Sequence, residues 1–207
     1  QLSRTLAEVE GPVLLLKGAA YAAAGLPPAE GRLFSDIDLL VPKEQIDAVE
    51  SELMLGGWNS SQRSPYDQRY YRQWMHEIPP MTHIRRQTVL DLHHNILPET
   101  ARLRTHAGPI IDRARPLAAF PRFCVPSPVD LVLHSATHLF HEGEWGHGLR
   151  DLVDGIRFHQ NPIVLHGGGV VESEFHFLSR AHGERGLREH QLFSFGRYHE
   201  IRWRRSE

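Results

Sequence analysis

The sequence predicts an α+β protein, in which a small mixed β-sheet with flanking helices is followed by a helical C-terminal domain. Short apolar runs bounded by turn residues, typical of buried strands, lie mainly in the first half of the chain. From Pro128 onward, apolar residues recur at spacings of three and four, which is typical of helices. We therefore predict two domains, an α+β unit over residues 1–115 and a helical unit over residues 116–207.

The overall composition favours a globular protein. The chain has 207 residues, of which 41% are hydrophobic, and its 23 basic and 25 acidic side chains give a formal net charge of −2. This balance argues against disorder and against a general nucleic-acid coat protein. The longest apolar runs fall far short of the ~20 residues that a membrane span needs. A single cysteine, Cys124 in an apolar segment, predicts an unreactive buried thiol and a reducing, cytoplasmic location.

The first 57 residues predict alternating strands and helices. A continuous apolar run predicts a strand over 13–16, and the alanine-rich segment that follows predicts a short helix over 19–24, closed by Gly25. A second apolar run predicts a strand over 37–41. Apolar residues at helical spacing predict a helix over 43–55, which the Gly56-Gly57 pair ends.

The next segment predicts a loop followed by three strands. Residues 59–68 are rich in Asn, Ser and Pro, and we expect a loop there. Strands are predicted over 70–76, 81–85 and 88–93, the last two joined by a tight turn near Arg86-Gln87. In the second half, a helix from Pro128, a helix over 149–158 and two or three helices after the glycines at 167–169 are expected.

The most informative motif is the pair Asp36 and Asp38 in the segment Ser35-Asp36-Ile37-Asp38-Leu39-Leu40-Val41. Side chains alternate along a strand, so both carboxylates lie on one face, roughly 7 Å apart at Cα, while Ile37 and Leu39 point into the core. Two carboxylates on one face can share a hard cation such as Mg²⁺, which proteins usually hold through one or two carboxylates and the substrate phosphates. Exposed strand edges also carry acids, so the surrounding sequence decides the interpretation.

A third carboxylate follows in Val89-Leu90-Asp91-Leu92-His93. Alternation places Asp91 and His93 on one face and Leu90 and Leu92 on the other. If this strand neighbours the strand that bears Asp36 and Asp38, Asp91 completes a triad and can accept the proton of an attacking hydroxyl. In isolation, a surface position on a half-exposed strand is the favoured interpretation of Asp91, and the acidic pair upstream reverses that preference.

Three segments together resemble the polymerase β-type nucleotidyltransferase superfamily, namely 13–18, 32–41 and 89–93. Within it the chain is most similar to a bacterial family of nucleotidyltransferases that pairs a Lys-Gly turn with an Arg-x-x-x-Asp-Ile-Asp-Leu-Leu-Val block and a later apolar-Asp-x-His strand. The resemblance extends over about residues 10–200. It implies transfer of an NMP group from an NTP, most commonly ATP, to a hydroxyl-bearing acceptor, with release of pyrophosphate. The resemblance does not identify the acceptor. Nucleic acid would be a partner only in the role of acceptor.

The resemblance also implies roles for individual residues. Asp36, Asp38 and Asp91 would be catalytic and would bind Mg²⁺ or Mn²⁺. Nucleotide contacts would come from four residues near the turn and the motif: Lys17, Gly18, Arg32 and Ser35. Gly18 would form a turn whose backbone N–H groups approach the triphosphate. The superfamily usually has Ser after this glycine, whereas the chain has Ala19, so Lys17 or Arg32 is expected to supply charge instead.

Histidines offer further candidate contacts and one alternative function. His134, His138 and His141 share one helical face, and with His93 and Asp151 they are candidate substrate contacts. A His-x-x-x-His spacing also suits a transition metal, which keeps a metal hydrolase open as an alternative. A binding module without catalysis is the other alternative, for which Ala19 is the discordant feature. His76-Glu77 and Arg85-Arg86 are expected at the surface.

Overall fold

The computed structural model describes residues 1–62, 64–141, 164–165 and 169–170. It confirms a mixed α+β fold with a seven-stranded sheet in the order β3-β4-β5-β2-β1-β7-β6 and flanking helices. The strands are β1 (Leu14–Leu15), β2 (Asp36–Leu40), β3 (Trp58–Ser60), β4 (Met81–His83), β5 (Val89–His93), β6 (Arg115–Pro116) and β7 (Cys124–Val125). A separate hairpin joins β8 (Val164–Leu165) to β9 (Gly169–Val170).

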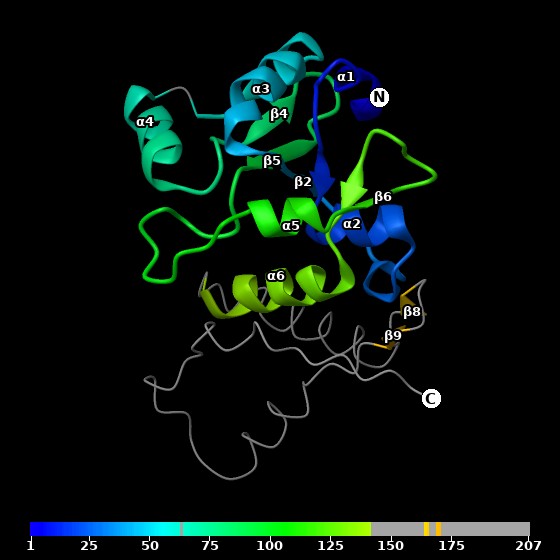
Figure 1. Ribbon diagram of the computed structural model, residues 1–207. Helices are drawn as coiled ribbons and strands as arrows, with labels where there is room; N and C mark the ends of the chain where they lie inside the picture. Colours follow the sequence, from blue (N-terminus) through cyan, green and yellow to red (C-terminus); the bar gives the residue numbers. More distant parts are fainter. Residues whose placement is uncertain (63, 142–163, 166–168, 171–207) are drawn as a thin grey trace.

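Helices lie on both sides of this sheet (Figure 1). They are α1 (Leu2–Thr5), α2 (Lys17–Ala24), α3 (Ile46–Leu55), α4 (Pro65–Trp74), α5 (Gly108–Asp112) and α6 (Pro128–His141), with 3₁₀ turns at Pro27–Ala29 and Lys43–Gln45. In Figure 1, α1 and α3 lie above the sheet and α5 and α6 lie below it. None of the described helices is long and apolar enough to cross a bilayer.

The central strands β2 and β5 run parallel, with Asp38 opposite Asp91 and Leu39 opposite Leu92. The condition under which Asp91 joins the two other carboxylates, that these strands are neighbours, is therefore met. β1 pairs antiparallel with β2 on one side and parallel with β7 on the other. Leu15 is buried in the core on one face of the sheet and Leu14 in the core on the other, so β1 is buried on both faces, which explains the continuous apolar run at 13–16.

The two faces of the central strands are chemically different. Leu39, Leu90 and Leu92 join the main core, in which residues of α2 and α3 are also buried and against which Leu2 of α1 packs. A second core on the other face joins Leu14, Leu16 and Leu40 to residues of α5. Elsewhere on β2 and β5, this second face carries acidic and histidine side chains in place of apolar ones. The predicted alternation along β2 and β5 is thus confirmed.

One predicted strand is wrong. Residues 70–76 are expected as a strand, but α4 occupies residues 65–74, and β3 begins at Trp58 and extends into the segment expected as a loop. Pro65 occupies the first turn of α4, where a missing N–H costs nothing, and Tyr66, Tyr70 and Trp74 stack at helical spacing on its exposed side. The aromatic residues that favour a strand are thus satisfied by contacts along one face of a helix.

The other elements that the sequence predicts within the described residues agree with the structure in type, whereas α1, α5, β6 and β7 were not predicted. The turn before β5 places Gln87 at a positive φ of 57°, and Gly25 ends α2 at a φ of 64°. Cys124 is half-buried, so the expectation of a fully buried thiol is wrong. The sheet includes β6 and β7, which lie at and beyond the predicted division at residue 115. That division stays a prediction, and the helices expected after residue 148 lie outside the described residues.

Candidate active site

The polar face of β2 and β5 brings three carboxylates together. Asp36 and Asp38 alternate with the half-buried Ile37, and Asp91 lies in register with Asp38 on the adjacent strand. Adjacent strands are about 4.8 Å apart. Asp36 is exposed and accepts a hydrogen bond from the Ser35 hydroxyl at 3.4 Å, whereas Asp38 is only 2% exposed. The three acidic side chains therefore lead from the solvent into the protein.

Asp38 is compensated by two cationic groups. The Lys17 Nζ lies 3.0 Å from Asp38 Oδ1, and the His93 Nε2 lies 3.1 Å from the same oxygen. Burial alone would raise the pKa of the Asp38 carboxyl, but the hydrogen bond from His93 and the charge of Lys17 outweigh it. They hold the pKa of Asp38 well below its usual range, so this carboxylate stays ionised.

Asp91 lacks such compensation. Its Oδ1 is buried and has no hydrogen-bond partner among the described residues. Burial, followed by the negative charges of Asp38 and Glu77, raises the pKa of Asp91 to about 6. A carboxylate in this setting is poised to accept a proton or a cation near neutral pH.

Lys17 reaches Asp38 because of an unusual backbone conformation. Its φ is 43°, one of two positive φ values at non-glycine residues among those described. Lys17 is the first residue of α2, and only Leu16 separates it from β1, so this conformation lies at the tight junction of strand and helix. The sequence predicts a phosphate contact for Lys17, and the geometry adds an ion pair with the acidic motif.

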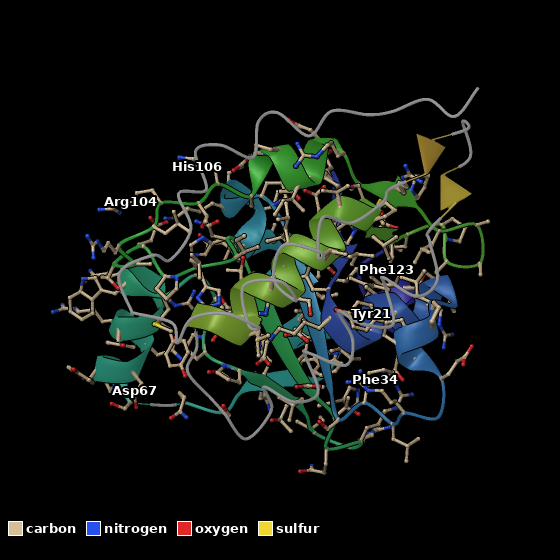
Figure 2. The ribbon with its side chains drawn as sticks, turned by 90° about the horizontal axis from the view of Figure 1, so that it is seen from below. Tyr21, Phe34, Asp67, Arg104, His106 and Phe123 are labelled. Carbon is tan, nitrogen blue, oxygen red and sulfur yellow. The ribbon has the colours of Figure 1, made fainter. Side chains whose placement is uncertain are left out.

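Gly18 is required by space. A Cβ at this position would lie 2.0 Å from Cδ1 of Phe34. The Phe34 ring in turn lies under the Arg32 guanidinium, 5.0 Å from it, and Arg32 also donates to the carbonyl of Pro28 at 3.3 Å. Phe34 lies beside α2 in Figure 2. The Arg32 charge is thus held near the first turn of this helix, next to the acidic motif. Ala19 packs against the core, a role that a small apolar residue fills.

His93 links the acidic motif to a further cluster. Its Nε2 faces Asp38, and its Nδ1 lies 3.1 Å from Oε2 of Glu77. His76 stacks on His93 with the ring centroids 5.3 Å apart. The surface position expected for His76 is wrong, because this side chain is 6% exposed. A β-bridge between Glu77 and His93 holds the segment that bears His76 and Glu77 against β5. The alternation of residues along a strand does not reveal this contact.

Helix α6 covers this face of the sheet (Figure 2). His134 is buried, and burial together with the positive charges of Lys17 and His93 lowers the pKa of His134 to about 3. A neutral imidazole therefore lies close to the Lys17–Asp38 pair. The influence of His138 on the same pKa places it near His134, on the shared helical face that the sequence predicts.

A capped N-terminus fixes the position of α6. The Ser127 hydroxyl donates to the Asp130 carboxylate and accepts the Asp130 backbone N–H, and Arg113 binds Asp130 through two nitrogens at 2.6 and 3.1 Å. Arg113 directly follows α5, so this contact ties α6 to the neighbouring helix.

The remaining predictions concern Asp151 and a metal site on the histidines of α6. Asp151 lies outside the described residues. Among the described side chains, the group with metal-ligand geometry is His76, Glu77 and His93, and it contains neither His134 nor His138. A ligand set on the α6 histidines therefore gains no support.

Sequence reasoning missed one aromatic residue of the site. Tyr71 of α4 is half-buried, and its pKa is raised by burial and then by the charges of Glu77 and Asp91. The hydroxyl is therefore close to both carboxylates. The signal was hidden because residues 70–76 read as a strand.

Comparison with known proteins identifies a family for the chain. The profile of a protein family described as "Uncharacterised nucleotidyltransferase" matches residues 1–162. No curated protein sequence matches the chain. Among solved structures, the chain is similar to ANT(2″)-Ia in complex with adenylyl-2″-tobramycin, at 13% identity and a TM-score of 0.45, covering 74% of this chain and 84% of that one. A solution structure of the antibiotic-resistance factor ANT(2″)-Ia matches at 14% identity and a TM-score of 0.44, covering 89% and 94%.

Proposed function

Because the chain belongs to this nucleotidyltransferase family, we propose that it transfers an NMP group from an NTP, most commonly ATP, to a hydroxyl-bearing acceptor and releases pyrophosphate. The observation that carries the proposal is the register of β2 and β5. It sets the ionised Asp38 opposite Asp91, whose buried Oδ1 has no partner among the described residues, with Asp36 beside them at the surface.

The site fits a divalent cation such as Mg²⁺ or Mn²⁺. Carboxylate oxygens are the ligands that these cations prefer, and a cation would satisfy the orphaned oxygen of Asp91 while relieving its repulsion with Asp38. Asp36, Asp38 and Asp91 would hold it. When bound, the metal supplies positive charge against the phosphates and orients them for in-line displacement.

The remaining residues bind and orient the substrates. The positive end of α2 and the Arg32 guanidinium favour binding of an anionic triphosphate near Gly18. Ser35 lies next to the acidic motif and contacts the nucleotide there. Lys17 keeps Asp38 ionised and adds positive charge at the same place. His93 of β5 and His134 and His138 of α6 lie between the sheet and this helix, where they contact substrate.

Asp91 is the proton acceptor of the proposed reaction. The acceptor hydroxyl gives its proton to the Asp91 carboxylate, and its oxygen forms a bond to the α-phosphorus. The bond from that phosphorus to the bridging oxygen breaks, and pyrophosphate leaves with the bonding electrons. A carboxyl with a pKa of about 6 suits this role near neutral pH.

The test is a transfer assay with labelled NTPs. The protein is incubated with each α-labelled NTP and Mg²⁺, together with a metabolite extract or a macromolecule extract. We expect labelled product and an equal amount of pyrophosphate with one extract, and neither with Asp38→Asn. Metal-independent NTP binding that survives Asp36→Asn and Asp38→Asn, with no transfer to any extract, would contradict the proposal.

A further inference from the structure

Close to the carboxylates of β2 and β5, the structure holds a second set of metal-ligating groups of a different chemical kind. His76, Glu77 and His93 each present one ligand atom, and these atoms lie within 4.8 Å of one another. We infer that they form a distinct site for a divalent transition metal, for which Zn²⁺ is the reference ion. This inference goes beyond the proposed transfer reaction.

The donor set differs from that of a magnesium site. Two imidazoles and one carboxylate suit zinc and its neighbours in the first transition series, whereas Mg²⁺ prefers oxygen ligands. Asp36, Asp38 and Asp91 supply oxygen only. The two sets of groups would therefore select different ions from the same solution.

The distance between two of the donors is already close to that of a coordinated pair. A zinc ion lies about 2.1 Å from an imidazole nitrogen and from a carboxylate oxygen, and at a tetrahedral angle these donors are roughly 3.4 Å apart. His93 Nδ1 and Glu77 Oε2 are 3.1 Å apart. A small movement would admit the ion between them.

The backbone around the site is fixed. The Glu77–His93 bridge is flanked by hydrogen bonds from the His94 N–H to the His76 carbonyl at 2.8 Å and from the Ile78 N–H to the Leu92 carbonyl at 3.0 Å. The segment that bears His76 and Glu77 is therefore attached to β5 as an extra strand-like edge. Stacking of the His76 and His93 rings adds to this order.

His93 has the partner that metal-binding histidines usually have. A ligating imidazole commonly donates its other N–H to a carboxylate, which fixes the ring and raises its basicity as a ligand. When Nδ1 of His93 is the ligand, its Nε2 faces Asp38 at 3.1 Å. Asp38 would then belong to both sites, as a ligand at one and as the support of a ligand at the other.

Burial and access are also suitable. The side chains of His93 and Glu77 are 4% and 17% exposed, so the donors are shielded but the Glu77 edge is open to solvent. Negative charge from Glu77, Asp38 and Asp91 surrounds the position, with Lys17 as the nearby cation. A divalent cation would balance this charge.

The experiment is equilibrium dialysis of the full chain against Zn²⁺ in excess Mg²⁺, followed by elemental analysis. We expect one Zn²⁺ per chain. Glu77→Gln, which preserves size, should weaken Zn²⁺ binding at least tenfold, and His76→Ala should abolish it. The matched control is His106→Ala, an exposed histidine at the periphery of the molecule, which should bind Zn²⁺ as the wild type does (Figure 2).

Co²⁺ in place of Zn²⁺ gives a second readout. Its visible d–d absorption reports the number and geometry of the ligands, and we expect the spectrum of the wild type to change in Glu77→Gln even if His76→Ala fails to fold. Zn²⁺ binding that is unaffected by Glu77→Gln, or equally reduced by His106→Ala, would overturn the inference. Asp36→Asn separates the two sites, because it should retain Zn²⁺ while losing the effect of Mg²⁺ on NTP affinity.

Discussion

The two faces of the strands β2 and β5 use the same backbone for different purposes. On one face Leu39 and Leu92 lie opposite each other and are fully buried in the main core. On the other, Asp38 and Asp91 lie opposite each other one residue away. The apolar pair is buried by packing within the protein. In the acidic pair, Asp38 has Lys17 and His93 as partners, whereas Oδ1 of Asp91 has no hydrogen-bond partner among the described residues. Side chains on one face therefore stabilise the fold, and side chains on the other face are available for binding and catalysis.

The largest expected effect is that of Asp38→Asn. This change removes the charge that pairs with Lys17 and His93 and that would hold the metal. We expect the Mg²⁺-dependent part of NTP affinity and the transfer activity to disappear, which calorimetric titration and the transfer assay would measure. Retention of the Mg²⁺ effect in the folded variant would show that the acidic face is not the nucleotide site.

Leu92→Ala tests the opposite face at the neighbouring position. Removal of a fully buried leucine side chain from the core is expected to cost about 2–5 kcal/mol of the free energy of unfolding. Urea denaturation measures this loss. The fraction that remains folded should bind Mg·NTP with affinity close to that of the wild type. If affinity fell as steeply as stability, the division of roles between the faces would be wrong.

Asp91→Asn should separate catalysis from binding. Acceptance of the proton from the attacking hydroxyl occurs chiefly in the transition state, so we expect turnover to fall on the order of 10² or more. Nucleotide affinity should stay within a few fold. The kcat and the Kd for Mg·NTP distinguish these effects, and an equal loss in both would assign Asp91 to nucleotide binding alone.

The unpaired state of Asp91 also predicts a pH dependence of stability in the metal-free protein. The pKa of Asp91 is raised in the folded state from 3.8 to about 6, so its contribution is fully present below about pH 4 and is lost as the pH rises through about 6. Each pKa unit corresponds to about 1.4 kcal/mol, which gives on the order of 2 kcal/mol after solvent screening. Denaturation of the wild type and Asp91→Asn between pH 4 and 7 should show this difference. Parallel curves would contradict it.

Gly18→Ala should produce an effect on stability of similar size to the pH effect of Asp91. The added methyl group would collide with the Phe34 ring and displace it, at a cost of about 1–3 kcal/mol. The double variant Gly18→Ala/Phe34→Leu should recover part of the loss, because the smaller side chain yields space. Thermal denaturation of the four proteins in the cycle measures the coupling, and additive effects would show that the ring is not the obstacle.

The fold and the acidic motif were largely predictable because local patterns determine them. Period-two alternation placed Asp36 and Asp38 on one face, and the apolar runs located β1, β2 and β5. The register of Asp38 against Asp91 required the pairing of β2 with β5, which the sequence suggested only as a condition.

Tertiary contacts determine the parts that sequence reasoning missed. Tyr70 and Trp74 are aromatic residues of high strand propensity, yet Pro65 and the stacking along α4 favour a helix. His76 and Glu77 looked like surface residues because their partner His93 lies 16 or more positions away in the chain. Contacts of this kind leave no local period to detect.

The order of the strands has a consequence for synthesis on the ribosome. Leu14 of β1 pairs with Leu40 on one side but with Cys124 on the other, a partner 110 positions later. Strands β2, β4 and β5 all end before residue 94. Most of the sheet can therefore assemble while one edge of β1 still has unpaired backbone N–H and C=O groups. Such an edge can recruit another nascent chain. Prompt arrival of β7 therefore protects the growing protein from aggregation, in addition to completing its sheet.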